Sequence, residues 1–332
     1  MSHCIEKRDF VYGLEGQGHD WHGLTVEKPG PLTKELFPKF REVGLQTAEG
    51  LVIPWRVLVT DDDGQVCGNP FTDSFGYILP GRAWDMVGEA LNGTKYTVER
   101  VGMLKDRSLW FVSVSLEELK DIARKGEAFR LNFSGGLDGG TSPQGELSHI
   151  RVVCWNTLSA SRSQGEHLFK VRQTKNSGDK LEEAKKEVEK AVGMATLVNK
   201  ALTQLEETPC NVDAARYAYA GEVAAHGADF KITFTKAGDK RENRARNTVD
   251  AMIGLFNTGQ GNRGETKADL LNGFTEYLTH GRKDSKKNIW NTVVSSEFGG
   301  NADRKASFFD AVCDDNKFTD LVTAGKEAWL NV

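Results

Sequence analysis

The stretch KYTVERVGMLKDRSLWFVSVS (residues 95–115) decides the fold class of this chain. Its two halves, KYTVERVGML (95–104) and SLWFVSVS (108–115), are rich in the β-branched and aromatic residues that favour strands. Between them, Lys105, Asp106 and Arg107 form a short polar break that is typical of a turn. The pattern therefore predicts a hairpin of two antiparallel strands.

Further strands and two short helices are predicted around this hairpin. LVIPWRVLVT (51–60) ends at the turn residues DDDG (61–64), and QVCGNPFTDSFGYIL (65–79) continues as a second strand and a loop. The later segments with strand-forming composition are AFRLNFSGG (128–136), SHIRVVCW (148–155) and HLFKVRQT (167–174). The helices are expected at GRAWDMVGEAL (81–91) and LEELKDIARKG (116–126), the second opened by a capping box of Ser115 and Glu118.

The second half of the chain has the pattern of helices. Residues 179–207 repeat apolar residues at helical intervals, and pairs such as Glu182 and Lys186 favour a solvated helix face. Further helices are predicted at about 211–225, 243–258, 264–282, 286–296 and 302–325. Because strands and helices segregate along the chain, we predict an α+β fold. Its β-rich antiparallel domain would span residues 1–176, and a helical domain packed on it would span 177–332.

The composition narrows the classes of protein to consider. The 332 residues carry a net charge of −4, so contact with nucleic acid would need a local basic patch. No apolar run approaches the roughly 20 residues that cross a bilayer, and the first residues, MSHCIEKRDF, lack a signal-peptide core. The five cysteines are scattered without a C-x-x-C pair, which is typical of a reducing compartment. We therefore expect a cytoplasmic protein without a membrane partner.

The segment HIRVVCWNTLSASR (149–162) is the first candidate site. Asn156 and Thr157 are predicted to cap a helix of small residues, and the N-terminus of such a helix would also suit an anion. The segment lacks the glycines of a G-x-S-x-G nucleophile elbow. Cys154 would act as a nucleophile only beside a base such as His149 or His167, and a buried, inert thiol is the alternative interpretation.

Two other segments are candidates for a ligand or metal site. SGGLDGGTS (134–142) surrounds Asp138 with four glycines, a composition that can hold phosphate through backbone N–H groups but also suits a flexible loop. It lacks the G-K-[ST] ending of a P-loop. FTEYLTHGRK (274–283) places Glu276 and His280 four residues apart on one helix face. That spacing suits two metal ligands, and equally a polar contact on a helix surface.

Basic residues gather in two segments despite the acidic total. KAGDKRENRARN (236–247) carries five Lys or Arg residues, HGRKDSKK (280–287) carries four, and Arg304 and Lys305 follow. If these segments converge, they would contact successive phosphates, and binding would depend steeply on salt. The aromatic residues near them would add stacking surfaces unless they pack in the core. These residues are Phe274, Tyr277, Trp290 and Phe298.

Several motifs resemble those of a known family. RVVCWNTL (151–158) matches the RVVCxNTL motif of that family in full, and TEYLTH (275–280) is similar to its TEYxDH motif, with Thr279 in place of the aspartate. The central loop is similar to its NSHDGS element but lacks the histidine, and FGGNADRK (298–305) is similar to its FGxGAxxK element. The chain thus resembles the phage/plasmid-like proteins, a domain-of-unknown-function family of phages, plasmids and mobile elements. The motif residues are Asn132, Asp138, Cys154, Asn156, Thr157, Glu276, Tyr277 and His280.

The resemblance implies a mobile-element setting, and hence DNA replication, recombination or defence evasion. Strand hairpins followed by a long helix are similar in order to single-strand annealing proteins, and we find no complete catalytic constellation. We therefore predict a non-enzymatic protein without a cofactor that binds single-stranded DNA in a bacterial host cell and assembles into homo-oligomers. Phosphate contacts are predicted from Arg151, Arg241, Arg244, Arg246, Arg282, Lys283, Lys286 and Lys287.

Two alternative functions are also compatible with the sequence. A metal-dependent nuclease or phosphate-processing hydrolase would use Asp138, Glu276, His280 and His149 to hold Mg²⁺ or Mn²⁺ and activate water. It requires the glycine-rich loop to meet the helix of Glu276 in space. An interaction protein that counters a host defence system would instead bind one host protein and no nucleic acid.

Overall fold

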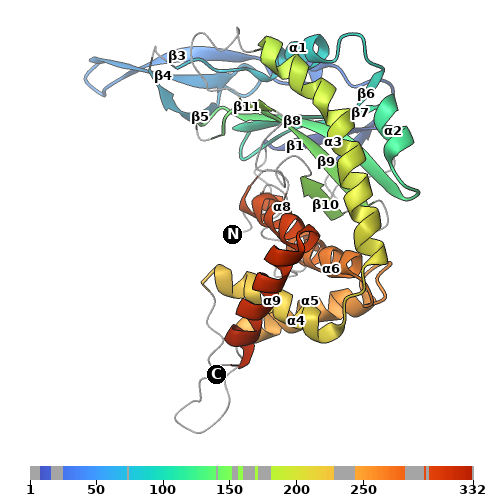
Figure 1. Cartoon of the computed structure of the whole chain (residues 1–332). Coiled ribbons are helices and arrows are strands. Elements are labelled where there is room, and N and C mark those ends of the chain that lie inside the picture. Colours follow the sequence, from blue (N-terminus) through green and yellow to red (C-terminus); the bar gives the residue numbers. More distant parts are fainter. Residues whose placement is uncertain are drawn as a thin grey trace, which may run out of the picture.

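The computed structural model describes most of the chain. The described residues are 8–15, 25–72, 75–139, 141–151, 156–159, 169–170, 181–227, 244–280, 295–296 and 299–330, and at 151, 156–159, 169 and 181–189 the backbone alone is described. Figure 1 shows a β-rich upper part and a helical lower part, with the helix α3 (Leu181–Glu207) running across both. The predicted α+β class is confirmed, whereas the predicted boundary near residue 176 lies outside the described residues.

The larger sheet has the strand order β10-β9-β8-β7-β6-β1-β2, and β11 pairs with β9 beside β10. All its neighbours are antiparallel except β1 and β2, which are parallel. Its strands are β1 (Phe10–Leu14), β2 (Thr25–Lys28), β6 (Tyr96–Leu104), β7 (Leu109–Leu116), β8 (Glu127–Gly136), β9 (Gln144–Arg151), β10 (Asn156–Ser159) and β11 (Phe169–Lys170).

The predicted hairpin of residues 95–115 is confirmed as β6 and β7, at the centre of this sheet. Its turn is made by three consecutive residues in the left-handed region, with φ of 52° at Lys105, 54° at Asp106 and 64° at Arg107. Such values are uncommon outside glycine, so neighbouring contacts must stabilise this turn.

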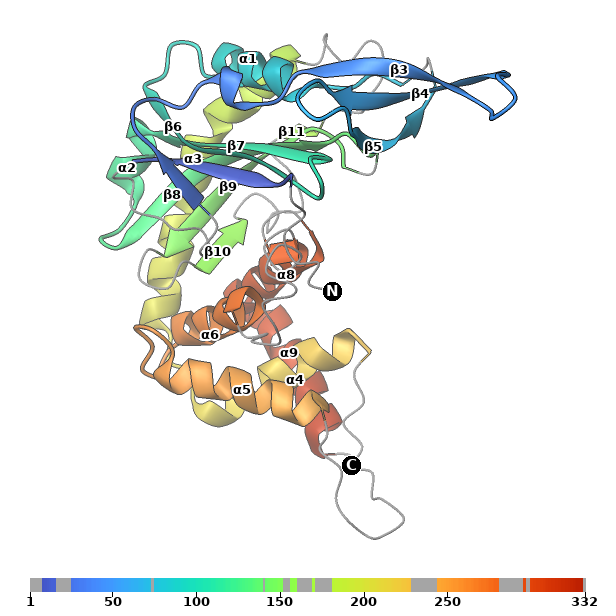
Figure 2. The same ribbon diagram turned by 180° about the vertical axis from the view of Figure 1, so that it is seen from behind.

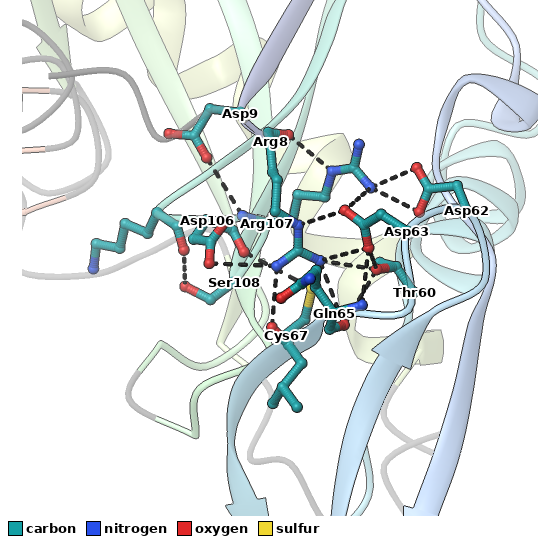
Figure 3. A network of polar contacts seen from close by, with 12 residues as sticks. Arg8, Asp9, Thr60, Asp62, Asp63, Gln65, Cys67, Asp106, Arg107 and Ser108 are labelled. Carbon is teal, nitrogen blue, oxygen red and sulfur yellow. Dashed lines mark hydrogen bonds and ion pairs between the residues drawn. The ribbon is translucent and has the colours of Figure 1, made fainter. Parts of the chain in front are cut away.

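A polar network provides those contacts and joins the larger sheet to a smaller one (Figure 3). Arg8 forms ion pairs with Asp63 (2.8 Å) in the turn of the smaller sheet and with Asp106 (3.3 Å) in the hairpin turn. Arg107 donates to the carbonyl oxygen of Arg8 (2.8 Å) and pairs with Asp62 (2.7 Å). Two arginines thus hold both turns against the segment that leads into β1.

The smaller sheet has the order β3-β4-β5, formed by β3 (Phe40–Gln46), β4 (Val52–Thr60) and β5 (Val66–Phe71), and the 3-10 helix η2 (Lys34–Leu36) precedes it. Its β3–β4 end projects from the body of the molecule (Figures 1 and 2). Gly44 pairs with Arg56 but Leu45 pairs with Ile53, so Pro54 and Trp55 form a bulge in β4. A bulge accommodates proline because the missing N–H is not needed for the ladder.

One face of the larger sheet packs on helices. These are α1 (Pro80–Ala90), α2 (Glu117–Ile122) and α3, which lies in front of the sheet in Figure 1 and behind it in Figure 2. Alternate residues of β7 and β8, including Val112 and Leu131, share one hydrophobic cluster with Ala195 and Val198 of α3. Strand alternation turns every second side chain to this face.

The helical part contains α4 (Val212–Ala225), α5 (Arg244–Thr258), α6 (Lys267–His280), α8 (Gly300–Cys313) and α9 (Asp315–Leu330). The single helix predicted at 302–325 is wrong, because the chain breaks at Asp314. The Asp314 carboxylate accepts the backbone N–H groups of Asn316 (2.9 Å) and Lys317 (3.1 Å) and so starts a new helix. No described helix is both long and apolar enough to cross a membrane.

Two predicted caps are also wrong. Asn156 and Thr157 do not cap a helix but begin β10, in which they pair with Arg151 and Ile150 of β9. Ser115 does not cap α2, because it lies in β7 and pairs with Thr97. In both places strand pairing satisfies the backbone groups that a cap would otherwise have served.

Candidate functional site

The second face of the larger sheet is polar but buried, which is unusual. The register places Ser113 opposite Arg100 and Asn132, and Asn132 opposite Glu146. We call the set the polar face. It comprises Glu99, Arg100, Ser113, Ser115, Arg130, Asn132, Ser134, Gln144, Glu146 and Ser148, all buried except Asn132, which is partly exposed.

A bulge in β6 brings two charged residues to this face. Val98 pairs with Val114 and Arg100 pairs with Ser113, so Glu99 is an extra residue in the strand. Two consecutive side chains are therefore buried, and Glu99 forms an ion pair with Arg130 on β8. Bulges of this kind re-aim side chains and are over-represented beside active sites.

Other hydrogen bonds tie neighbouring members of the polar face together. The Asn132 amide donates to Ser148 Oγ (2.9 Å), and the Gln144 amide donates to Glu146 Oε1 (2.9 Å). Buried charges seldom add net stability, because desolvation offsets their attraction. This arrangement is therefore a candidate for function rather than a stability device.

A small cavity of about 10 Å³ opens beside the bulge, with room for one water-sized group. It lies between the polar face and the edge strands β1 and β2. Its lining residues are Gly13, Leu14, Thr25, Glu27, Glu99, Arg100 and Arg130. Glu99, Arg100 and Arg130 are not among the site residues predicted from the sequence. The signal that could have found them is the presence of charged residues inside otherwise apolar strands.

His149 lies on the other face of β9 from this site. Its Nε2 is 2.9 Å from Oε2 of Glu127, which also forms an ion pair with Arg124. Arg124 in turn pairs with Glu206 of α3 (2.9 Å). Burial raises the pKa of Glu127, but the contacts with His149 and Arg124 outweigh it and hold this pKa at about 2. The cluster therefore joins β8 and β9 to α3.

We expect Glu127→Gln to remove a pH-dependent part of the stability. Because the pKa of Glu127 is below its ordinary value of 4.5, the ionised carboxylate stabilises the folded state above pH 4.5, and that stabilisation is lost as the pH falls towards 2. The expected loss is about 1–2 kcal/mol, since solvent access screens the ion pairs. Urea unfolding at a series of pH values should show a flatter slope of the free energy of unfolding against pH in this window for the variant than for the wild type.

The four residues of the predicted metal site lie in different surroundings. Asp138 follows β8, and its carbonyl oxygen accepts from the side-chain amide of Asn69 in β5 (2.8 Å). Glu276 lies in α6, near Gly259 at the end of α5, while His149 contacts Glu127. Within the described part of the chain, no group of three or more His, Cys, Asp or Glu residues could hold a metal ion. The glycine-rich loop and the helix of Glu276 therefore do not form the predicted ligand group there.

Three motif segments do meet. The strand β10 of the RVVCWNTL motif contacts both α6, which carries Glu276, Tyr277 and His280, and α8. At this junction Lys305 is buried, and its Nζ donates to Ser296 Oγ (2.6 Å). Lys305, which follows the two basic segments in the sequence, is therefore not available to contact a phosphate. His280 is exposed at the end of α6.

The predicted phosphate contacts are described in part. Most of the side chains predicted to contact phosphate lie outside the described residues: Arg151, Arg241, Arg282, Lys283, Lys286 and Lys287. The predicted nucleophile Cys154 lies outside them as well. Arg244 is exposed at the first residue of α5. Arg246 lies with its guanidinium 4.4 Å from the ring centre of Trp329 and donates to the carbonyl oxygen of Trp329 (2.8 Å).

A second arginine approaches the same tryptophan from α4. The guanidinium of Arg216 is 5.9 Å from the ring centre of Trp329 and pairs with Asp213 (3.2 Å). We call Arg216, Arg244, Arg246 and Trp329 the basic edge. By contrast, Phe274 is fully buried, and the two predicted aromatic residues Trp290 and Phe298 lie outside the described residues.

The family to which the chain belongs follows from a match over most of its length. A family described as "Domain of unknown function (DUF932)" matches residues 71–307, well over half of the chain. The chain belongs to the DUF932 family. The match takes in the polar face and the junction of β10 with α6 and α8, whereas β1 to β4 precede it. No curated protein and no solved structure matches the chain.

Proposed function

We propose that this DUF932 protein binds single-stranded DNA and serves a phage or another mobile element as an annealing-type recombination factor that self-assembles. The observation that carries the proposal is the basic edge, where arginines of two helices gather around Trp329. Arginine and aromatic side chains together suit a flexible strand, because one contacts phosphate and the other offers a stacking surface.

The position of Arg244 adds to this argument. Its side chain is exposed at the start of α5, and the sequence places Lys240 and Arg241 shortly before it. Successive cations of this kind neutralise successive phosphates and release counterions. The order of strand hairpins before the 27-residue helix α3, similar to single-strand annealing proteins, is compatible with the same function.

We expect the full chain to bind a fluorescently labelled oligonucleotide of arbitrary sequence, with affinity that falls steeply between about 50 and 200 mM salt, as phosphate contacts require. Arg244→Gln should weaken binding and reduce the slope of log affinity against log salt by about one. The measurement is fluorescence anisotropy.

The matched control is Lys34→Gln, which removes one exposed cation that pairs with Asp85 (3.1 Å) away from the basic edge. It should bind as the wild type does. Absence of binding at low salt, or binding without a salt slope, would remove the proposed function. Equal losses in the two variants would remove the basic edge as its surface.

A further inference from the structure

The outer half of the β3–β4 hairpin is apolar and, among the described strands, has no third one beside it. β5 pairs with β4 no further out than Arg56, so residues 45–55, which we call the outer arm, form a two-stranded hairpin that projects from the molecule (Figure 2). The single charged residue of the outer arm is Glu49, whereas Leu51 is 68% exposed and Val52 is 79% exposed. Because an isolated two-stranded hairpin is only marginally stable in water, the outer arm would gain from further contacts.

The outer edge of β3 is open among the described residues. β3 ends the strand order of the smaller sheet, whereas the strand at its other end, β5, contacts the segment after β8 through Asn69 and Asp138. The carbonyl oxygen of Lys39 accepts from the N–H of Asp61 (3.0 Å), so the odd-numbered residues of β3 turn their backbone groups to β4. Lysine and proline commonly protect such an edge, and β3 contains neither. The residues that point their N–H and C=O groups outward are therefore Phe40, Glu42, Gly44 and Gln46.

The sequence of β3 is self-complementary about Gly44. The five residues centred on this glycine read EVGLQ, so an apolar and then a polar residue follow it in both directions. In an antiparallel pair that places Gly44 opposite Gly44 of a second copy, Val43 lies opposite Leu45, and Glu42 lies opposite Gln46. Apolar side chains then face apolar ones, and a carboxylate faces an amide that can donate to it.

Charge and space favour this register and this partner. The same register places Lys39 opposite Glu49, whereas a pair centred on Glu42 would oppose two carboxylates. Gly44 is exposed, with no atom within 4 Å of the position of a Cβ, and a glycine inside a strand often marks the close approach of another backbone. The outer arm contains no lysine or arginine, which nucleic acid or an anionic lipid surface would require.

We propose that β3 joins two copies of this chain by pairing with β3 of the second copy about a two-fold axis at Gly44. The two smaller sheets then form one sheet of six strands, and each outer arm gains the strands of the other copy as neighbours. About six backbone hydrogen bonds form, because each of the three outward pairs exchanges two. An interface of this symmetry closes at two copies. It deepens the self-assembly in the proposed function, on which its role rests, and it lies before the family match at residues 71–307.

Gly44→Pro in the full chain should prevent this pairing without unfolding the hairpin. The N–H that proline removes points away from β4, so the variant loses hydrogen bonds in the interface alone. In sedimentation velocity without DNA, wild type should be a dimer, and the variant should dissociate with a Kd at least about tenfold higher. A monomeric wild type at every concentration, or a variant that dimerises as wild type does, would overturn the proposal. Oligonucleotide binding is measured separately, so loss of the dimer and loss of DNA binding are distinguishable.

Gly44→Cys tests the register itself. Residues in a hydrogen-bonded antiparallel pair have Cα atoms about 5.5 Å apart, which is within the range of a disulfide. Mild oxidation should therefore cross-link two copies of this variant, as seen on denaturing gels with and without reducing agent. The matched control is Ala48→Cys in the exposed turn, where the same register holds the two new thiols roughly 27 Å apart along the strands. Equal cross-linking of the two variants, or none in Gly44→Cys, would contradict the proposed pairing.

Discussion

Replacing Gly325 by alanine is expected to destabilise the helical part by about 3 kcal/mol or more, because a backbone contact cannot yield to a new methyl group. A Cβ at Gly325 in α9 would lie 1.7 Å from the carbonyl oxygen of Tyr217 and 2.5 Å from the backbone nitrogen of Gly221, both in α4. Reciprocally, a Cβ at Gly221 would lie 2.3 Å from the carbonyl oxygen of Leu321. The two helices thus cross at glycines, and urea unfolding would measure the loss.

Gly254→Ala is the matched control for this substitution. Gly254 lies in α5, is exposed, and has no atom within 4 Å of the position of a Cβ. Alanine there should raise the free energy of unfolding by about 0.5–1 kcal/mol through helix propensity alone. If the two substitutions changed stability alike, the close crossing of α4 and α9 would be contradicted.

The elements that could be predicted are those with strong local patterns. The hairpin of β6 and β7 follows from two strand-forming runs around three polar residues, and α1 follows from the helical spacing of Trp84, Val87 and Leu91. The helical periodicity of residues 179–207 predicts α3 to within two residues at its start and to the residue at its end. In each case the local periodicity and the tertiary environment favour the same structure.

The segment of residues 149–162 shows where local reasoning fails. Asn156 and Thr157 have good capping propensity, but strand pairing with β9 determines their structure. Strand pairing is a contact between residues that can be far apart in the sequence, so it cannot be predicted from a short segment alone. The same holds for Asp314, whose capping side chain divides one continuous helical pattern into α8 and α9.

The candidate site was harder to predict than the fold for a similar reason. In β8, apolar Leu131 and Phe133 alternate with polar Asn132 and Ser134, a pattern that is typical of a strand with one solvated face. The alternation of apolar and polar residues indicates which side chains share a face of the strand. It does not indicate whether other parts of the chain cover that face. The burial of Ser134, at 1% exposure, arises from packing between distant parts of the chain. The bulge at Glu99 likewise depends on its partner strand.

Arg130→Met is expected to cost about 3–5 kcal/mol, because it leaves the buried carboxylate of Glu99 without its ion-pair partner. Arg130 is 3% exposed and Glu99 is 6% exposed, so bulk solvent does little to screen the unpaired carboxylate. The control is Arg82→Met on α1, where Arg82 pairs with Glu89 (2.8 Å) and both side chains are half exposed. That pair should be worth less than about 1 kcal/mol. Denaturant unfolding would measure both losses.

The double variant Glu99→Gln/Arg130→Met separates the two causes of such a loss. If the cost comes from the unpaired carboxylate, removing its charge should recover much of the stability, since neutral replacements of buried ion pairs are often nearly as stable as the pair. If it comes from lost packing of the Arg130 side chain, the double variant should be no more stable than the single one. Recovery would mean that the charges are retained for function rather than for the stability of the fold.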